Sequence, residues 1–388
     1  MMFKTFAVLT FLPLYGVYSA EPGLTVHEWG TLTSVADENG DSVRWVSLRP
    51  PADLPCFVYH LGAQCVKCAA SRVRMETPVI YFYSPRALTA SVHVALPSGV
   101  VSEWYPAASG AAADAITYGN AGKIAWNRIE VTPGAAPSLP VTTEPSHYYA
   151  ARETDASPLR VGAENEKLLF YRGIADFEVP LAPLFLPDGK LELRNTETEP
   201  IPFALIFENR GGRTGFRVVG GWTGNLVVDA PELTGDVSAV QEHLGAALRS
   251  AGLFPKEAAA MIATWRDSWF EEGMRIFYLV PRKTVDTVVP IRVDPAPSAL
   301  ERVFVGRVEV LSPAMRQALQ TALVSGDTAT LPKYSRFARP FCDRVLHEPG
   351  APRIAPAAAA FLARADRVLT PNAAPCRVDT PPVVTEQH

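Results

Sequence analysis

Proline and glycine interrupt this chain often, with 35 Pro and 26 Gly among its 388 residues. Proline cannot continue a helix or donate a hydrogen bond inside a sheet, and glycine marks turns. The sequence therefore favours short strands and loops over long helices. Its 48% hydrophobic and 20% charged residues are typical of a globular protein with a substantial core. This composition excludes a disordered chain, a collagen and a coiled coil.

The charge balance is close to neutral. The chain has 36 basic and 40 acidic residues, which gives a formal charge of −4. Proteins that bind nucleic acids usually carry a basic domain or patch, whereas the basic residues here are scattered. We therefore expect neither a nucleic-acid partner nor an anionic membrane surface as partner.

The first twenty residues have the features of a secretory signal peptide. Lys4 precedes an apolar run over residues 5–18, and small residues follow at Ser19 and Ala20. The run is too short to cross a bilayer, and no later run reaches about 18 apolar residues. We expect cleavage near residue 20, no transmembrane span in the mature protein, and a periplasmic or extracellular location.

Five cysteines are consistent with an oxidising compartment, where disulfides are the usual outcome. We expect Cys342 to pair with Cys376 and two of the other three to form a bridge, which leaves one cysteine over. The five are Cys56, Cys65, Cys68, Cys342 and Cys376.

The cysteine cluster near the N-terminus has two other interpretations. Together with His60, the cysteines at 56, 65 and 68 could hold a zinc ion, although only one C-x-x-C pair is present. A redox C-x-x-C would need a helix after Cys68, and residues 69–71 do not predict one. Disulfide formation remains the favoured interpretation.

The pattern of hydrophobic residues predicts a mainly β protein with an α+β C-terminal part. Alternating residues at 88–96, and other short strand candidates such as 24–35 and 123–131, predict an N-terminal antiparallel, sandwich-like unit over residues 21–220. Residues 221–370 predict helices packed on a mixed or antiparallel sheet, and residues 371–388 form an irregular tail. The two parts can share one core.

Capping residues and periodicity define the C-terminal elements more closely. A helix is expected at 236–250 from its apolar stripe, and another at 255–272 with Pro255 in its first turn. A third is expected from Pro313 onward, capped by Ser312-Pro313, and a last one at 356–369. Strands are expected at 274–280, 285–293 and 302–311.

The segment from Thr25 to Thr31 is the densest polar and aromatic stretch near the N-terminus. On a strand, His27 and Glu28 point to opposite faces, so they do not bind one metal together. A structural strand is the simpler interpretation. Alternatively, His27 is a metal ligand and Glu28 a catalytic base in a site that other segments complete, with His147 as a second ligand for a divalent metal.

The second notable stretch is 264–273. Trp265 and Trp269 lie on one stripe of the expected helix, where they pack on the sheet or, alternatively, form a sugar-stacking surface. Glu272 falls on the same side, at the helix C-terminus, where the dipole disfavours an anion. It is therefore either an ion-pair partner or a catalytic acid.

Four segments of this chain together resemble a group of exported bacterial proteins of uncharacterised function. They are His27-Glu28-Trp29-Gly30-Thr31, residues 76–83, residues 103–106 and residues 264–273. The resemblance spans most of the mature chain and implies an exported bacterial protein. It transfers no activity, cofactor or catalytic residue.

These observations predict an exported globular protein that binds a ligand or a cell-envelope component. The alternative is a secreted hydrolase, with or without a bound metal ion, that uses His27, Glu28, His147 and Glu272. The chain has no nucleophile elbow, P-loop or G-x-G-x-x-G motif, so the sequence leaves open whether the protein is an enzyme.

Overall fold

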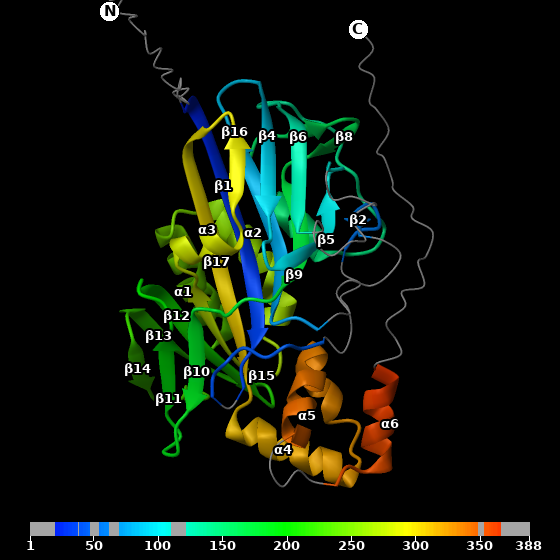
Figure 1. Ribbon diagram of the computed structural model, residues 1–388, viewed down its shortest axis with the longest axis vertical. Coiled ribbons are helices and arrows are strands. Elements are labelled where there is room, and N and C mark those ends of the chain that lie inside the picture. The colour runs from blue at the N-terminus through cyan, green and yellow to red at the C-terminus, as the bar shows by residue number, and fades with distance from the viewer. Residues whose placement is uncertain are drawn as a thin grey trace, which may run out of the picture.

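The computed structural model describes residues 20–37, 39–46, 54–61, 70–109, 122–347 and 353–365. Over these residues the protein is mainly β, with large sheets and with its α-helices in the C-terminal part (Figure 1). The expected mainly β class with a helical C-terminal part is confirmed.

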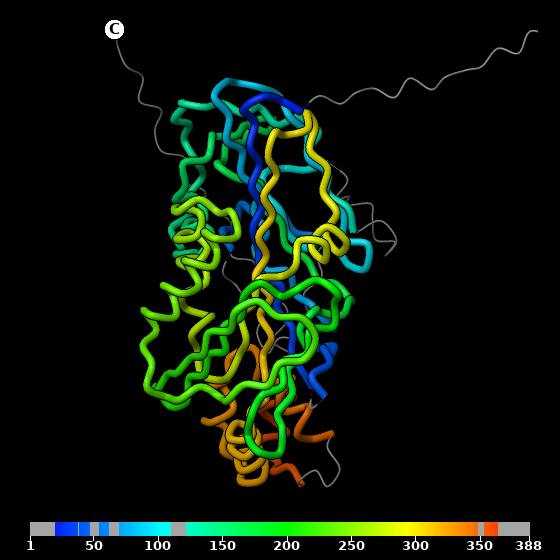
Figure 2. The backbone as a smooth tube through the Cα atoms, turned by 90° about the vertical axis from the view of Figure 1, so that its left-hand side faces the viewer, coloured from blue at the N-terminus to red at the C-terminus, as the bar shows by residue number. Residues whose placement is uncertain are grey.

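A nine-stranded sheet runs through the molecule. Its strand order is β13-β12-β15-β17-β1-β3-β9-β5-β2, and only the β1–β17 pair is parallel among these neighbours. Figure 2 shows these two strands side by side along much of the molecule. The strands are β1 (Glu21–Val35), β2 (Tyr59–His60), β3 (Val73–Tyr83), β5 (Gly99–Tyr105), β9 (Leu169–Ala175), β12 (Ile201–Arg210), β13 (Arg213–Trp222), β15 (Gly273–Leu279) and β17 (Pro297–Val310).

Two smaller antiparallel sheets accompany the large one. The first has the order β16-β4-β6-β7-β8 and the second β10-β11-β14. Their strands are β4 (Leu88–Ala95), β6 (Lys123–Val131), β7 (Leu159–Val161), β8 (Glu164–Glu166), β10 (Leu181–Phe185), β11 (Leu191–Asn195), β14 (Asn225–Val228) and β16 (Ile291–Asp294).

The helices begin where the sequence supplies caps. The Asp236 side chain accepts a hydrogen bond from the Ser238 amide, and Ser312 accepts one from the Met315 amide. None of the described helices is long and apolar enough to cross a membrane. They are α1 (Val237–Ser250), α2 (Pro255–Trp269), α3 (Arg282–Val288), α4 (Pro313–Ser325), α5 (Ala338–His347) and α6 (Pro356–Ala365), with 3-10 helices η2 (His147–Arg152) and η3 (Leu331–Phe337).

The large sheet is covered on both faces. One face packs against the two smaller sheets and α4, α5 and α6, through a core that includes Trp126, Phe304 and Leu319. The other face packs against α1, α2 and η2, through a core that includes Trp29 and Trp269. Because both faces are covered, the residues of β1 from Val26 to Val35 are buried on both sides of the strand rather than alternating between buried and exposed.

The large sheet contains strands from both expected parts of the chain. Strands β15 and β17, from the C-terminal part, lie between β12 and β1. Residues before and after position 220 therefore form one continuous sheet.

One expected strand is wrong. Residues 285–293 form the end of α3 and then β16. Val285 and Val289 are the fully buried residues of this segment, and their spacing of four fits a helical turn. An Arg282–Asp286 ion pair, also four apart, supports that turn.

The described cysteines differ in state. Cys56 is disulfide-bonded, and its partner lies outside the described residues, as do Cys65, Cys68 and Cys376. Cys342 is a free thiol in the structure, so the bond expected between it and Cys376 is not formed there. Its side chain lies in the apolar core beside Phe341, and burial together with Asp343 raises the pKa of the thiol to about 12.

Candidate functional site

The face of the large sheet that packs against α1, α2 and η2 is apolar along most of its length and charged toward one end. Five neighbouring strands contribute a row of buried polar side chains, which we call the polar band. Neighbouring residues on a strand point to opposite faces of the sheet. Leu32, Tyr171 and Val308, which adjoin members of the row, belong to the core on the other face. The row therefore lies on the face that α1, α2 and η2 cover. The polar band consists of Arg275 (β15), Arg307 and Glu309 (β17), Thr33 (β1), Arg74 and Glu76 (β3), and Arg172 (β9).

One half of the polar band holds the end of α2. Glu309 Oε1 accepts hydrogen bonds from Nε of Arg275 at 3.0 Å and from Nε of Arg307 at 2.6 Å. Nη1 of Arg275 donates to the carbonyls of Trp269 and Glu271, at 2.8 and 2.7 Å. Since the last carbonyls of a helix have no partner within it, Arg275 caps α2.

Glu76 is the carboxylate at the centre of the other half. Thr33 Oγ1 donates to Oε2 of Glu76 at 2.7 Å, and Nη2 of Arg336 in η3 donates to the same oxygen at 3.0 Å. Nη1 of Arg336 donates to Oε1. Burial alone would raise the pKa of Glu76, but the Arg336 guanidinium outweighs it and holds the pKa at about 2.

Arg74 and Arg172 complete the band. The Arg74 guanidinium lies over the Trp45 ring, 4.6 Å from its centroid, and Nη2 of Arg172 donates to Thr77 Oγ1 at 3.2 Å. Burial lowers the pKa of Arg74 to about 10; Glu76 and Glu103 oppose this shift and Arg336 adds to it. Glu103 pairs with Arg172 across β5 and β9 in the sheet register.

A cavity of about 140 Å³ opens beside these residues. The sheet forms one wall, α2 and the residues after it form the second, and η2 and η3 close the sides. The lining residues are Arg74, Met75, Glu76, Arg172, Gly173 and Ile174 from the sheet, Thr264, Trp265, Ser268 and Glu271 from the α2 side, Ser335 and Arg336 from η3, and His147 from η2.

Two features mark this cavity as more than a packing defect. Ser335 has φ 49° and ψ −131°, and Thr77, next to Glu76, has φ 53°, which are costly backbone conformations for residues other than glycine. The indole N–H of Trp265 and Nε of Arg336 are buried with no hydrogen-bond acceptor among the described residues. Backbone strain and unsatisfied buried donors are both characteristic of functional sites.

The structure places His27 away from this cavity. Nδ1 of His27 lies 2.7 Å from Oε2 of Glu257 on α2, and its ring packs against Tyr83 and Phe254. Glu257 also accepts hydrogen bonds from the Tyr83 hydroxyl and the Phe254 amide. His27 therefore fixes the start of α2 on the sheet, as in the structural interpretation of its strand.

Glu28 points to the opposite face, as expected from the strand alternation. Its Oε1 accepts a hydrogen bond from the Tyr171 hydroxyl and its Oε2 one from Nε of Arg302, each at 2.6 Å. Burial, with Glu28 adding to it, raises the pKa of the Tyr171 hydroxyl well above its usual value. No cavity-lining residue contacts this carboxylate.

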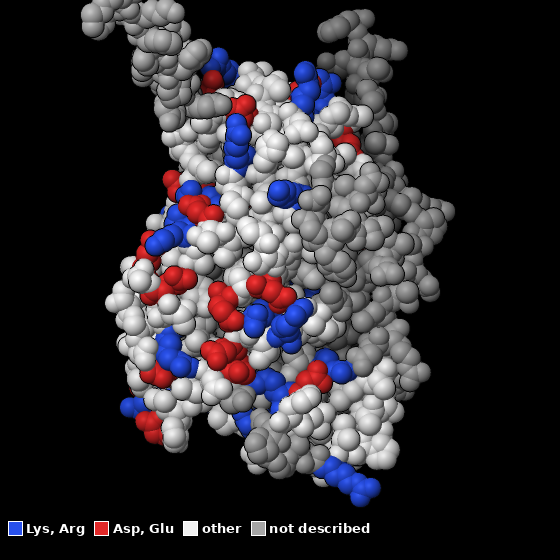
Figure 3. All heavy atoms as spheres, viewed as in Figure 1, with Lys and Arg blue, Asp and Glu red and all other residues white. Residues whose placement is uncertain are grey.

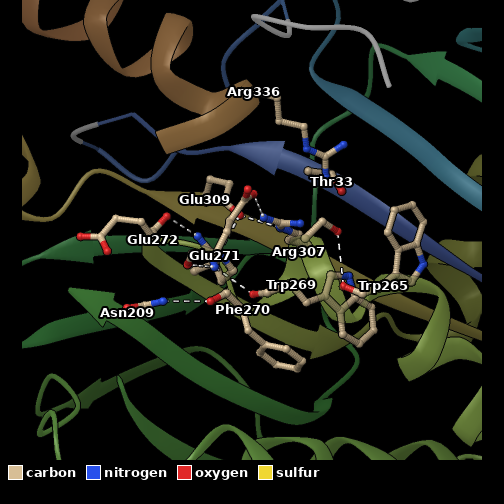
Figure 4. Close-up of polar contacts among 12 residues, drawn as sticks. Thr33, Asn209, Trp265, Trp269, Phe270, Glu271, Glu272, Arg307, Glu309 and Arg336 are labelled. Carbon is tan, nitrogen blue, oxygen red and sulfur yellow. Dashed lines mark hydrogen bonds and ion pairs between the residues drawn. The ribbon is translucent and has the colours of Figure 1, made fainter. Parts of the chain in front are cut away.

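His147 lines the cavity, and Glu272 does not. Nε2 of His147 lies 3.9 Å from Oδ2 of Asp267. Both carboxylate oxygens of Glu272 accept from the Gly211 amide in the β12–β13 turn, at 2.9 Å, and in Figure 4 this side chain points away from Trp265. The carboxylate that faces the cavity belongs to the preceding residue, Glu271.

The four proposed catalytic and metal-binding residues thus do not converge. His27, Glu28 and Glu272 have separate partners, and only His147 lines the cavity. Among the described residues, no group of three or more His, Cys, Asp or Glu is placed to hold a metal ion. His60 is on β2, and two of the cysteines proposed beside it lie outside the described residues.

Both tryptophans of α2 are buried. Trp269 is fully buried against Phe277, and Trp265 is 5% exposed at the cavity wall. They pack the helix onto the sheet, so a solvent-exposed sugar-stacking surface is excluded for this pair.

The surface charges do not form a comparable site on the face drawn in Figure 3. Basic and acidic side chains are interspersed there among the described residues.

Comparisons with known proteins add little. No known family matches this sequence, and no curated protein does. The yeast delta-COP-I mu-homology domain is a solved structure with 9% identity, and the match covers 74% of this chain and 98% of that domain. Its TM-score of 0.28 is too low to carry an argument about fold or function.

Proposed function

We propose that this chain is an exported binding protein that holds a small ligand by an anionic group in the cavity beside the polar band. The ligand is a free solute or part of a cell-envelope component. The location is periplasmic or extracellular. In support, β1 begins at Glu21, directly after the expected signal peptide. We also propose that the N-terminal strands form the expected sandwich-like unit, with the β4–β6 sheet packed on the large sheet.

The charge of the cavity wall carries the proposal. Among the lining residues, three arginines stand against two glutamates, and 3 − 2 leaves one positive charge in excess, which Glu103, outside the lining, offsets in part. Both glutamates already bind arginines, Glu76 through Arg336 and Glu271 through Arg307. A buried guanidinium binds a carboxylate or phosphate through two parallel hydrogen bonds, and such a ligand would offset the cost of burying the charge.

The size of the cavity limits the ligand. A cavity of about 150 Å³ accommodates a ring of about six carbon atoms. The cavity described here is of that size, so it suits a compact molecule or one terminal group of a larger one.

The test measures the melting temperature at neutral pH as a function of ligand concentration. The ligands are the sodium salts of propionate, succinate and phosphate, and L-alanine, and sodium chloride is the control. We expect at least one of these four compounds to raise the melting temperature saturably, because binding only to the folded state stabilises it. Trp265 fluorescence supplies a second signal, since its ring lines the cavity.

Arg172→Lys keeps the charge but removes the planar fork, so we expect about tenfold weaker binding. The matched control is Arg128→Lys on β6, whose side chain is 74% exposed. If none of the four compounds gives a saturable response that Arg172→Lys weakens and Arg128→Lys leaves intact, the proposal is wrong.

The hydrolase alternative depended on His27, Glu28, His147 and Glu272 acting together. Since these side chains have separate partners, we do not carry it forward.

A further inference from the structure

We infer that the ligand is a small zwitterion of the amino-acid type, with its carboxylate at the arginine wall and its ammonium group at the α2 wall. This inference rests on the proposed function and adds the second charge of the ligand. It comes from a difference between the two walls of the same cavity.

The sheet wall and η3 supply cationic donors. Arg74 and Arg172 come from β3 and β9, and Arg336 comes from η3. The carboxylate on this side, Glu76, is bound by Arg336 and Thr33. This side of the cavity therefore favours an acceptor group that carries negative charge.

The α2 wall supplies acceptors. Thr264 Oγ1 donates to the Ala260 carbonyl at 2.8 Å, and Ser268 Oγ donates to the Trp265 carbonyl at 3.4 Å. A hydroxyl whose hydrogen is already donated to the helix offers its lone pairs to a ligand. These two residues, four apart on α2, thus act as acceptors toward the cavity.

Glu271 adds the negative charge on this side. Its Oε1 accepts from Nη2 of Arg307 at 3.1 Å, whereas no donor among the described residues is bonded to Oε2. The side chain is 16% exposed and lines the cavity just beyond the C-terminus of α2. Arg275 already caps the carbonyls of the helix end, so the ammonium group of the ligand would bind Oε2 of the Glu271 carboxylate.

Trp265 is the exception on this wall, because its indole N–H is a donor. It is neutral, so it leaves the separation of charge between the walls unchanged and supplies one more hydrogen bond to the carboxylate of the ligand.

The experiment compares three probes of matched size on the full-length mature protein: L-alanine, propionate and n-propylamine. We expect L-alanine to bind at least about tenfold more tightly than propionate, because a charged hydrogen bond adds about 1.5–3 kcal/mol. We expect n-propylamine to bind more weakly than either.

Glu271→Gln isolates the acidic side. Glutamine keeps an oxygen for Arg307 but loses the charge, so we expect L-alanine to bind about 10- to 100-fold more weakly and propionate to change less than about threefold. Glu272→Gln is the matched control, since that carboxylate binds the Gly211 amide and does not line the cavity.

The outcomes separate the two proposals. If propionate binds as tightly as L-alanine, or if Glu271→Gln affects both equally, the zwitterion is wrong and the anion site stands. If only succinate or phosphate binds, the zwitterion is likewise wrong and the anion site stands. If n-propylamine binds best, or if neither these probes nor succinate and phosphate bind, the proposed function itself fails.

Discussion

The protein buries two clusters of charge on opposite faces of the same sheet, and they differ in how completely they are paired. In the first, Glu28 is bound by Tyr171 and Arg302, and Arg302 also donates to Asp286 at 2.7 Å and to the Val289 carbonyl at 2.6 Å. In the second, the polar band borders a cavity and lies beside strained backbone and unsatisfied donors.

The difference teaches how to weigh buried charge. When every hydrogen bond of a buried ion pair is made, the attraction between its partners offsets the free-energy cost of desolvation. Such a pair fixes the relative position of the strands that carry it. A charged group that borders a cavity and is incompletely hydrogen-bonded retains part of this desolvation cost. A ligand that binds the group removes it. We therefore assign a structural role to the Glu28–Arg302 cluster and a ligand-binding role to the polar band.

The largest effect tests the first cluster. Arg302→Met leaves Glu28 buried without its cation, so we expect a loss of about 3–5 kcal/mol of unfolding free energy in urea. Arg282→Met is the control, because Arg282 contacts the same Asp286 from a half-exposed position. A loss below about 1 kcal/mol for Arg302→Met would mean that the cluster does not hold the strands.

The second largest effect is the loss of stability at low pH that Glu76 causes. The pKa of Glu76 is about 2 in the folded protein against an ordinary value of 4.5. A lowered carboxyl pKa adds stability that is fully present above the ordinary value and is lost as pH falls from there toward 2. The difference corresponds to about 3 kcal/mol.

We therefore expect Glu76→Gln to be less stable than the wild type at neutral pH and to lose less stability between pH 4.5 and 2. Urea unfolding at a series of pH values measures both. The control is Glu232→Gln, an exposed carboxylate. Equal pH dependence in the wild type and Glu76→Gln would show that the Glu76–Arg336 pair does not hold in solution.

The smallest effect tests the strain beside the cavity. Glycine adopts the Ser335 conformation without a steric penalty, so we expect Ser335→Gly to raise the unfolding free energy by about 1 kcal/mol. Ser325→Gly, at the exposed end of α4, should lower it by a few tenths. A melting temperature that falls in Ser335→Gly contradicts the strain and removes one argument that sets the second cluster apart.

Much of the fold could be predicted from local patterns. Residues 24–35 form β1 as expected, and Asp236, Pro255 and Ser312-Pro313 mark the beginnings of α1, α2 and α4. These predictions succeed because capping and period depend on neighbouring residues. The parallel pairing of β1 with β17 depends on residues about 270 positions apart, and no local signal encodes it.

The candidate site could not be predicted, for two physical reasons. Arg307 and Glu309 alternate with Val308 and Val310, which is typical of a strand with one face exposed to solvent. In the structure both faces are buried, because α2 and η3 cover the face that carries Arg307 and Glu309. A helix running to Glu272 places that carboxylate on the tryptophan side. The helix ends at Trp269, and Gly273, with φ 120°, directs the chain into β15, so Glu271 lines the cavity instead.

The β1–β17 pair has a consequence for how the protein is made. Strand β1 is synthesised long before residues 297–310, which pair with one of its long edges. Until then that edge offers unpaired backbone groups to any neighbouring chain. Folding is therefore completed only after most of translation, and a chaperone that shields β1 meanwhile would raise the yield of the native protein.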